Sequence, residues 1–338
     1  MFLLGYANAA LVEDEELSVY DLLNVLLIPS ANDAAFVLAE HIAGSVEKFS
    51  DMMNEKAKEL GCINTHFVNP NGIHDEDHYT TVSDLAIIGQ YAMKNETFRK
   101  IVSSTKYTLP ITNKYDKTDR IFNTTNELIK PTSKYFYEYA TGCKTGYTEP
   151  AKNCIIATAK KDNVEYMCVI LHDEKLEDGT SARELDCKTL FEYAFNSYSL
   201  LKLASKNDLV KSTTVRGATL KTRNLDLKLS DDIYVIVNNN FDLANTITET
   251  NINKDIEAPI EQDTTLGTVT YTVDNHSYTA NLLASHEVYK SNTLLIVMII
   301  FVTALFFGFI HKLFSTKPKK RRSHASHSYY YQNQKGRK

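Results

Sequence analysis

Two short polar motifs supply the side chains of this sequence that could do chemistry together. Ser30-Ala31-Asn32 carries a hydroxyl that can pass a proton and an amide that can hold a peptide group. Lys144-Thr145-Gly146 carries an ammonium and a hydroxyl that can bind a carboxylate, and its glycine lets a substrate backbone approach closely. The motifs therefore predict two sides of an acyl-transfer site. The candidate catalytic residues are Ser30, Asn32 and Lys144, and the candidate substrate-binding residues are Lys144, Thr145 and Gly146.

The first motif is expected in a bend between two helices. Ser18 and Asp21 have the spacing of a capping box, and the leucines that follow recur at helical spacing until Pro29. A second helix is predicted over 33–42 and a third over 45–60, each followed closely by a glycine. The hydroxyl and the amide of the first motif are therefore expected between the end of one helix and the start of the next.

The second motif is expected beside a β-sheet. Residues 151–172 read as two β-runs separated by the turn-like Lys161-Asp162-Asn163. Helix is predicted over 80–103 and over 181–201. Residues 206–285 contain short β-branched runs with little helical periodicity, which predicts a separate small β domain.

An uncharged apolar run lies near the end of the chain, over 293–310, and has about the minimum length that crosses a hydrocarbon core. Lys290 precedes it, whereas a basic cluster follows it, formed by Lys312, Lys317, Lys319, Lys320, Arg321 and Arg322. This asymmetry predicts a single transmembrane helix with its C-terminus in the cytoplasm and the body of the chain outside. The alternative is a buried helix of a soluble domain, but the low-complexity tail offers nothing to pack around it.

Charge and cysteine usage argue against several kinds of site. The net charge is −5, but residues 312–338 hold nine Lys or Arg and no acid, so the remainder carries about −14 and is a poor nucleic-acid binder. The five cysteines have neither CxxC nor metal-ligand spacing, so neither a disulfide scaffold nor a zinc site is predicted. His74 and His78 resemble a zinc motif, but they follow Pro70 and Gly72 and are expected in a loop near the site.

The two motifs resemble those of the serine-type D-alanyl-D-alanine carboxypeptidases, the low-molecular-weight penicillin-binding proteins, whose motif set is SxxK, SxN and KTG. The resemblance extends over residues 17–49, 53–86, 141–162, 258–260 and 266–284. It implies an α/β (α+β) penicillin-recognising serine transferase/β-lactamase-like sandwich with a mainly antiparallel sheet and a helical lobe, then a small all-β domain and a transmembrane helix. The resemblance predicts an incomplete catalytic domain at 1–203 and the small β domain at 204–288. The transmembrane anchor is expected at 289–312 and a basic cytoplasmic tail at 313–338.

By this resemblance the reaction removes the terminal D-alanine from peptidoglycan stem peptides. A serine forms an acyl-enzyme and water releases it, without a metal or an organic cofactor. Ser30 would relay a proton, Asn32 would contact the substrate amide, and Lys144 with Thr145 would bind the terminal carboxylate. The expected partners are a stem peptide ending in D-Ala-D-Ala, β-lactams if a nucleophile were restored, and the bacterial cell membrane through 293–310.

The sequence departs from the family pattern at three places. Ala31 stands where glycine is frequent, and Cys143 stands where leucine is common, either for packing or as a reactive thiol near the site. No SxxK precedes Ser30, although that is where the family places its nucleophile. Three SxxK spacings occur later in the chain. The first begins at Ser45 at an expected helix start, the second at Ser103 before an expected strand, and the third at Ser199 at an expected helix end. None of them is expected to be the nucleophile.

Three hypotheses follow from the missing motif. The first is that the chain lacks roughly its first 60 to 80 residues, because no SxxK is present and residues 1–47 hold no Lys or Arg for an export signal. The second is a catalytically inactive pseudoenzyme that binds the stem peptide or a protein partner. The third keeps the fold but changes the reaction to transpeptidation or β-lactam hydrolysis.

Overall fold

The structure is a computed structural model that describes residues 6–117 and 119–315. Within these residues the chain divides into two compact units. The first holds the chain up to Leu201 together with 234–244, and the second holds 202–233 and the chain from Asn245 onward. The domain limits expected from the sequence, at 203 and 288, stay a prediction.

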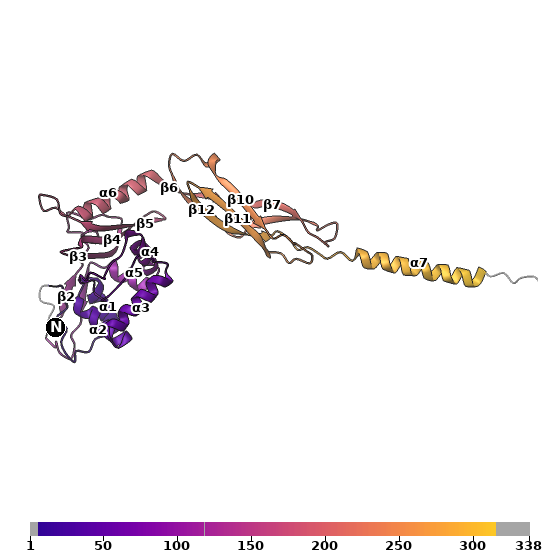
Figure 1. The fold of residues 1–338 in the computed structure, drawn as a ribbon. Coiled ribbons are helices and arrows are strands. Elements are labelled where there is room, and N and C mark those ends of the chain that lie inside the picture. Colours follow the sequence, from indigo (N-terminus) through magenta and orange to yellow (C-terminus); the bar gives the residue numbers. More distant parts are fainter. Residues whose placement is uncertain (1–5, 118, 316–338) are drawn as a thin grey trace, which may run out of the picture. The chain divides into compact units, whose positions relative to one another are not determined.

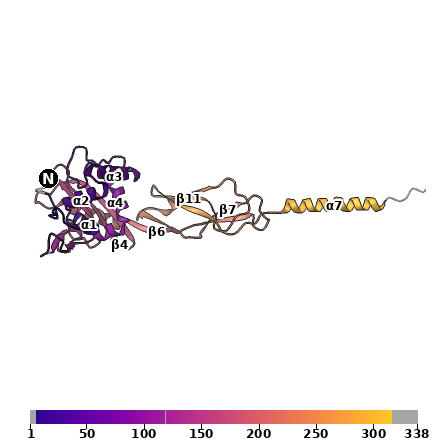
Figure 2. The same cartoon turned by 90° about the horizontal axis from the view of Figure 1, so that it is seen from below.

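The helical part of the first unit comes early in the chain. Its helices are α1 (Val19–Leu27), α2 (Asn32–Ala43), α3 (Val46–Glu59), α4 (Val82–Met93) and α5 (Glu96–Val102). The predicted capping box is confirmed, since Ser18 and Asp21 each accept a hydrogen bond from the other's backbone N–H at the start of α1. Gly44 ends α2 with a φ of 81°, a conformation that glycine adopts without strain. Helix α1 packs against α2, and α2 against α3 (Figure 2).

A three-stranded antiparallel sheet forms the centre of the first unit. Its strands are β3 (Ala140–Thr148), β4 (Lys152–Lys161) and β5 (Val164–Asp173), in the order β3-β4-β5, so that β3 is an edge strand. Figure 1 shows α6 (Ala182–Ser197) on one side of this sheet and the helices α1 to α5 on the other. Ile155 and Ala157 on β4 pack with Phe191 of α6, whereas Cys143 on β3 packs with Met93 and Val102 of α4 and α5. This layering confirms the predicted sandwich.

Smaller elements complete the first unit. Strand β1 (Lys106–Leu109) pairs with β2 (Arg120–Asn123), and a short turn of helix, η1 (Glu127–Ile129), follows. The helix predicted to end at residue 201 ends at Ser197 instead, because Tyr198 takes an extended conformation and begins β6 (Tyr198–Ala204). Strand β6 pairs with β9 (Ile233–Asn238), so sheet pairing overrides the helical pattern there.

The second unit contains a five-stranded antiparallel sheet. Its order is β10-β11-β12-β8-β7, and its strands are β7 (Leu209–Thr214), β8 (Asn224–Leu229), β10 (Ile247–Ile252), β11 (Thr265–Val273) and β12 (His276–Ala284). Leu225, Leu227 and Leu229 alternate along β8 and are fully buried. The predicted small β domain is therefore confirmed. A further turn of helix, η2 (Leu243–Asn245), precedes β10.

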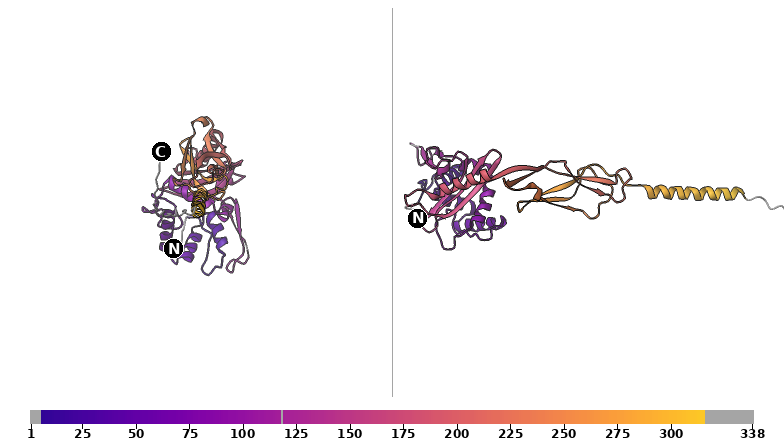
Figure 3. Two further views of the ribbon diagram at one scale, coloured as in Figure 1. Left: turned by 90° about the vertical axis from the view of Figure 1, so that its right-hand side faces the viewer. Right: turned by 90° about the horizontal axis from the view of Figure 1, so that it is seen from above.

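The last described element is the apolar helix α7 (Thr293–Ser315), drawn in yellow in Figure 3. The helix has 23 residues, its most apolar 18-residue stretch has a mean hydropathy of 2.8, and none of its side chains is buried, so length and composition fit a helix that crosses a membrane. This exposure does not fit the alternative of a core helix of a soluble domain. The basic tail that set the predicted orientation lies mostly outside the described residues, at 316–338.

Candidate active site

The first motif lies in the tight bend between α1 and α2. Ser30 has a φ of 66°, in the left-handed region that residues other than glycine seldom occupy. Ala31 is fully buried, and its backbone N–H donates to the carbonyl oxygen of Val25 at 3.1 Å. The alanine in place of the family glycine therefore packs without opening the bend, and the neighbouring serine side chain is turned toward β3.

The second motif lies on β3 and meets the first motif directly. The Nζ atom of Lys144 donates to Oγ of Ser30 at 2.8 Å and to the carbonyl oxygen of Thr145 at 2.8 Å. Two residues 114 positions apart in the sequence are thus brought into contact. The ammonium form of lysine supplies three donors, enough for both contacts.

The electrostatic environment of Lys144 weakens its hold on the proton. Burial in the cleft lowers the pKa of this lysine to about 8, and the positive charge of Arg183 acts in the same direction. At neutral pH the side chain still carries its charge in most molecules. A cation whose water shell has been partly removed binds an incoming anion more strongly than an exposed lysine does.

Thr145 and Gly146 continue the same wall. The Oγ1 atoms of Thr145 and Thr125 lie 2.6 Å apart, which holds the buried hydroxyl of Thr145 in place. A Cβ atom at Gly146 would lie 3.9 Å from Cβ of Cys154, an ordinary contact, so the chain's own packing does not require glycine there. Gly146 instead lines the open cleft.

All five predicted site residues line one cavity of about 460 Å³. They are Ser30, Asn32, Lys144, Thr145 and Gly146. Further polar residues on the walls were not predicted from the sequence, and these are Tyr6, Asn71, Thr125, Tyr147, Thr148, Asn153 and Arg183. The cavity is therefore built from the α1–α2 bend, the edge strand β3, the start of β4, the start of α6 and three loop segments, at 6–7, 71–73 and 125.

Both polar atoms of the Asn32 side chain form hydrogen bonds within the chain. Its Nδ2 donates to the carbonyl oxygen of Ala7 at 2.8 Å, and its Oδ1 accepts from Nδ2 of Asn71 at 2.9 Å. The neighbouring Asp33 carboxylate accepts from the backbone N–H groups of Ala9 and Leu11 at 2.9–3.0 Å. Asn32 thus fixes the segment around Ala7 as a wall of the cleft, and its contact with a substrate amide stays a prediction.

Arg183 is the cleft cation that sequence reasoning missed. Its Nη1 donates to the carbonyl oxygen of Gly146 at 3.5 Å, and its Nε donates to Oε1 of Glu184 at 2.8 Å. Glu184 is almost fully buried and holds the guanidinium beside β3. The only sequence signal is the position of Arg183 at the start of a predicted helix, and such a position does not by itself indicate a site.

Cys143 points away from the cleft and into the core. Its side chain packs against Met93 and Val102, and burial raises the pKa of its thiol to about 12. Such a thiol is almost entirely protonated at neutral pH. The structure therefore favours packing over the alternative interpretation of Cys143 as a reactive thiol.

This contrast predicts selective thiol chemistry. We expect a disulfide-exchange reagent to modify the partly exposed Cys154 of the native chain at least about tenfold faster than Cys143, because only thiolates react. Peptide mapping by mass spectrometry after timed quenching measures both rates, and the denatured chain provides the control. Equal native rates at the two cysteines would show that Cys143 is accessible.

The three alternative serines do not line the cleft that holds the two motifs. Ser45 accepts from the backbone N–H of Lys48 at the start of α3, as predicted, and Ser103 donates to the carbonyl oxygen of Lys100. Ser199 lies in β6, so the prediction that it ends a helix was wrong for the reason given above. The loop prediction for His78 holds, and its Nδ1 accepts from the backbone N–H of Val68 at 3.3 Å.

Known families and proteins resemble this chain over most of its length. Residues 4–175 match the family D-alanyl-D-alanine carboxypeptidase, and residues 198–290 match the penicillin-binding protein 5 C-terminal domain. The chain is 32% identical to D-alanyl-D-alanine carboxypeptidase DacF of Bacillus subtilis, over 84% of this chain and 69% of that protein. It is 26% identical to DacA of Haemophilus influenzae, over 81% of this chain and 66% of that protein. The chain thus spans about two thirds of the length of these relatives.

Solved structures agree on the fold. Penicillin-binding protein 5 from Haemophilus influenzae superimposes with a TM-score of 0.65 at 24% identity, covering 85% of this chain and 79% of that one. The Streptomyces K15 DD-transpeptidase superimposes with a TM-score of 0.51 at 32% identity, covering 56% of this chain and 72% of that one. With its first half matched to one family and an identity of 32% to DacF, the chain belongs to the D-alanyl-D-alanine carboxypeptidase family.

Proposed function

We propose that the chain binds the D-Ala-D-Ala end of a peptidoglycan stem peptide in the cleft between the α1–α2 bend and β3. The reaction class is removal of the terminal D-alanine through a serine acyl-enzyme, as the family implies. The observation that carries this proposal is the Lys144 ammonium, which is partly desolvated, bonded to Ser30 and placed beside Thr145. A terminal carboxylate is the group that this arrangement suits best.

The edge position of β3 supports the proposed binding mode. Strand β3 pairs with β4 on one side, and no described strand pairs with its other side. A substrate backbone can therefore add to this edge, with Gly146 leaving room for it. In this arrangement the carboxylate meets Lys144 and Thr145, Arg183 adds positive charge, and Ser30 relays a proton.

No described hydroxyl of the cleft has the SxxK spacing of the family nucleophile. The described cleft hydroxyls of serine and threonine belong to Ser30, Thr125, Thr145 and Thr148, and none of these residues has a lysine three positions later. Ser30 faces an ammonium that donates to it, so no neighbouring base is ready to activate its hydroxyl. We propose that turnover requires an SxxK segment beyond these residues. The alternative is that the chain binds stem peptides or a protein partner without catalysis.

The proposed reaction has one rival with an observation in its favour. The Streptomyces K15 protein, 32% identical to this chain, is named a DD-transpeptidase. A transpeptidase passes the acyl group to an amine, whereas a carboxypeptidase passes it to water. An extended, catalytically active form incubated with substrate and a glycine acceptor would separate the two, because only transpeptidation yields a peptide product that contains the acceptor.

We further propose that α7 anchors the chain in a bacterial cell membrane, with the body outside and the C-terminus in the cytoplasm. The apolar helix and the basic residues that follow it support this orientation. Protease added to intact protoplasts should digest the body and leave a tag on Lys338 protected. Digestion of the tag without membrane disruption would contradict the orientation.

The pKa of Lys144 predicts how binding depends on pH. Its value of about 8 lies below the usual 10.5 of lysine, so the ammonium is lost as the pH rises through 8. If only the charged form binds the carboxylate, the dissociation constant for a D-Ala-D-Ala peptide should increase about tenfold from pH 7 to pH 9. Calorimetry across this range measures it. A constant affinity would exclude Lys144 as the charged contact.

A further inference from the structure

The chain enters the apolar helix α7 directly from the β domain. Val288 is fully buried, and its backbone N–H and carbonyl each form a hydrogen bond with the backbone of Ile260, at 2.8 and 3.0 Å. The N–H of Ser291 donates to the carbonyl oxygen of Gly217 at 2.7 Å. Ser291 lies two positions before Thr293, where α7 begins. Two residue steps span at most about 7 Å, so no long linker separates the folded domain from α7.

A turn of the β domain is bonded to this same segment. The turn lies between β7 and β8, and the N–H of Thr222 closes it by donating to the carbonyl oxygen of Thr219 at 3.1 Å. The N–H of Thr219 donates to the carbonyl oxygen of Tyr289 at 3.0 Å, and the N–H of Tyr289 donates to Oγ1 of Thr222 at 3.2 Å. Leu220 and Lys221, at the tip of the turn, are thus held on the segment that leads into α7.

Two large side chains on this part of the surface are exposed. Leu220 is 84% exposed and Tyr289 is 54% exposed, whereas the leucines of β8 in the same domain are fully buried. In water, the exposed leucine leaves apolar area unburied that contact with an apolar layer would remove. Tyrosine is enriched where a membrane meets water, because its ring is apolar and its hydroxyl is polar. The two side chains therefore suit a lipid surface better than bulk water.

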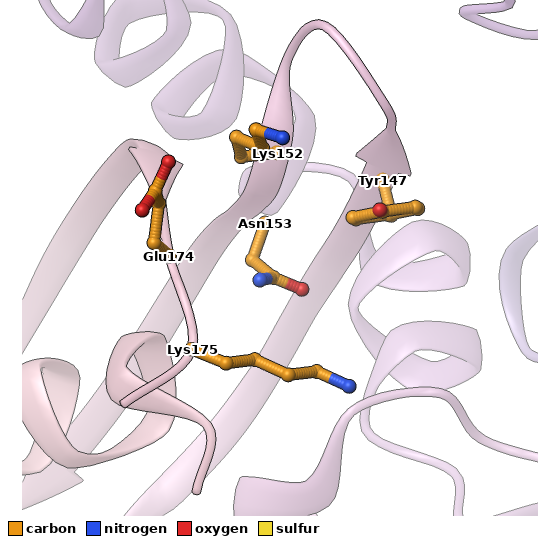
Figure 4. Close-up of a pocket in the computed structure, with 5 residues that line it drawn as sticks. All are labelled: Tyr147, Lys152, Asn153, Glu174 and Lys175. Carbon is orange, nitrogen blue, oxygen red and sulfur yellow. The ribbon is translucent and has the colours of Figure 1, made fainter. Parts of the chain in front are cut away.

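Basic residues flank the turn and the tyrosine. Lys221, Arg223 and Lys290 are exposed, and their side chains form no hydrogen bond or ion pair with any other described residue. By contrast, Lys152 beside the cleft, drawn in Figure 4, donates to a carboxylate oxygen of Glu149 at 2.9 Å. The three cations near α7 thus keep their bonding capacity for an anion outside the chain.

The acidic residues closest to this surface in sequence have other partners. The carboxylate of Glu257 is paired with the guanidinium of Arg216. Together with Asp255 it raises the pKa of this arginine. Glu287 accepts from the hydroxyl of Tyr289 at 2.8 Å. None of these carboxylates pairs with the three basic residues named above.

We propose that this part of the β domain is a lipid-contact surface, formed by Leu220, Lys221, Arg223, Tyr289 and Lys290. Its two large side chains enter the headgroup layer of the membrane, and its three basic side chains bind anionic headgroups. The inference rests on the proposed membrane anchor, because α7 brings this surface to the bilayer. One headgroup layer is roughly 5–8 Å thick, which matches the short distance between Ser291 and the start of α7.

The chain contains no tryptophan, so a single introduced tryptophan reports on its own surroundings. The full chain is placed in nanodiscs of phosphatidylcholine, or of a two-to-one mixture with anionic phosphatidylglycerol, with or without acyl chains brominated near the headgroup. In the anionic discs, bromination should quench at least about half of the emission of Leu220→Trp. The matched control is Leu209→Trp, which is 66% exposed at the other end of β7 and should keep its emission.

The basic side chains are tested by adding Lys221→Gln to the Leu220→Trp chain. A basic residue at an anionic surface changes the ratio of inserted to free turn by about fivefold, so quenching in the anionic discs should fall toward its value in pure phosphatidylcholine. Lys206→Gln, an exposed lysine before β7, should leave the quenching unchanged. Equal quenching of the Leu220→Trp chain in the two lipid mixtures overturns the role of anionic headgroups.

A tryptophan in α7 separates this inference from the anchor on which it rests. Leu294→Trp lies in the first turn of α7 and should be quenched in both lipid mixtures. Absence of quenching at this position overturns the anchor and the lipid-contact surface with it. Quenching of Leu294→Trp without quenching of Leu220→Trp overturns the lipid contact and leaves the anchor intact. Equal quenching of Leu220→Trp and Leu209→Trp overturns the assignment of the contact to this surface.

Discussion

A fluorescent penicillin should leave no covalent label on the 338-residue chain in membranes, at concentrations that saturate known penicillin-binding proteins. Labelling requires a serine that attacks the β-lactam carbonyl and a base that takes its proton. In the cleft, Ser30 receives a hydrogen bond from the Lys144 ammonium, and the described threonines lack a lysine at SxxK spacing. Without an activated hydroxyl, the drug can occupy the cleft but cannot acylate it.

The matched control is the same chain extended upstream by a segment that carries an SxxK and an export signal. We expect this form to label, and a Ser→Ala change in the added SxxK to remove the label. Stoichiometric labelling of the 338-residue chain at any serine would contradict the assignment of roles, above all if the labelled residue were Ser30. If neither form labels although both are folded and exported, the chain is a binding protein.

Replacing Lys144 by methionine should weaken binding of a D-Ala-D-Ala peptide by about 10- to 100-fold. A hydrogen bond to a charged group contributes roughly 1.5–3 kcal/mol, and 1.4 kcal/mol corresponds to a factor of ten in affinity. Methionine is unbranched and only one atom shorter than lysine, but it removes the charge and both hydrogen bonds to Ser30 and Thr145. Fluorescence or calorimetric titration of the purified full chain measures the loss.

The control for this substitution is Lys160→Met, an exposed lysine on β4 outside the cleft. It should leave the affinity unchanged. The melting temperature of Lys144→Met should not fall, because the substitution removes a charge that is poorly solvated in the folded chain. A Lys144→Met protein that binds the peptide within threefold of the parent would show that the carboxylate lies elsewhere.

Local rules were enough to predict the elements that hold the two motifs. The capping box at Ser18, the helix end near Pro29 and the glycine at position 44 each follow from backbone hydrogen-bonding needs that neighbouring residues satisfy. The two β-runs after the second motif form β4 and β5, and the turn predicted around Asp162-Asn163 separates them. Ser30 and Lys144 could therefore be placed on facing elements from sequence alone.

The remaining cleft residues depend on long-range packing that no local pattern encodes. Asn71 reaches Asn32 from a loop, and Thr125 reaches Thr145 across a turn. Arg183 is positioned by a buried glutamate beside it, in a helix whose sequence gives no sign of a site. The start of β6, from Tyr198, was predicted as helix, because its partner strand β9 is distant in the sequence and a short stretch of sequence does not show this pairing.

The most direct test of the cleft assignment compares one peptide in two forms, ending in D-Ala-D-Ala as the free acid and as the amide. Calorimetry on the purified full chain at pH 7 should find the acid bound at least about tenfold more tightly, because only the acid presents a carboxylate to Lys144 and Thr145. Equal affinities for the two forms, or no binding of either, would contradict the account of this cleft as the site for the peptide end.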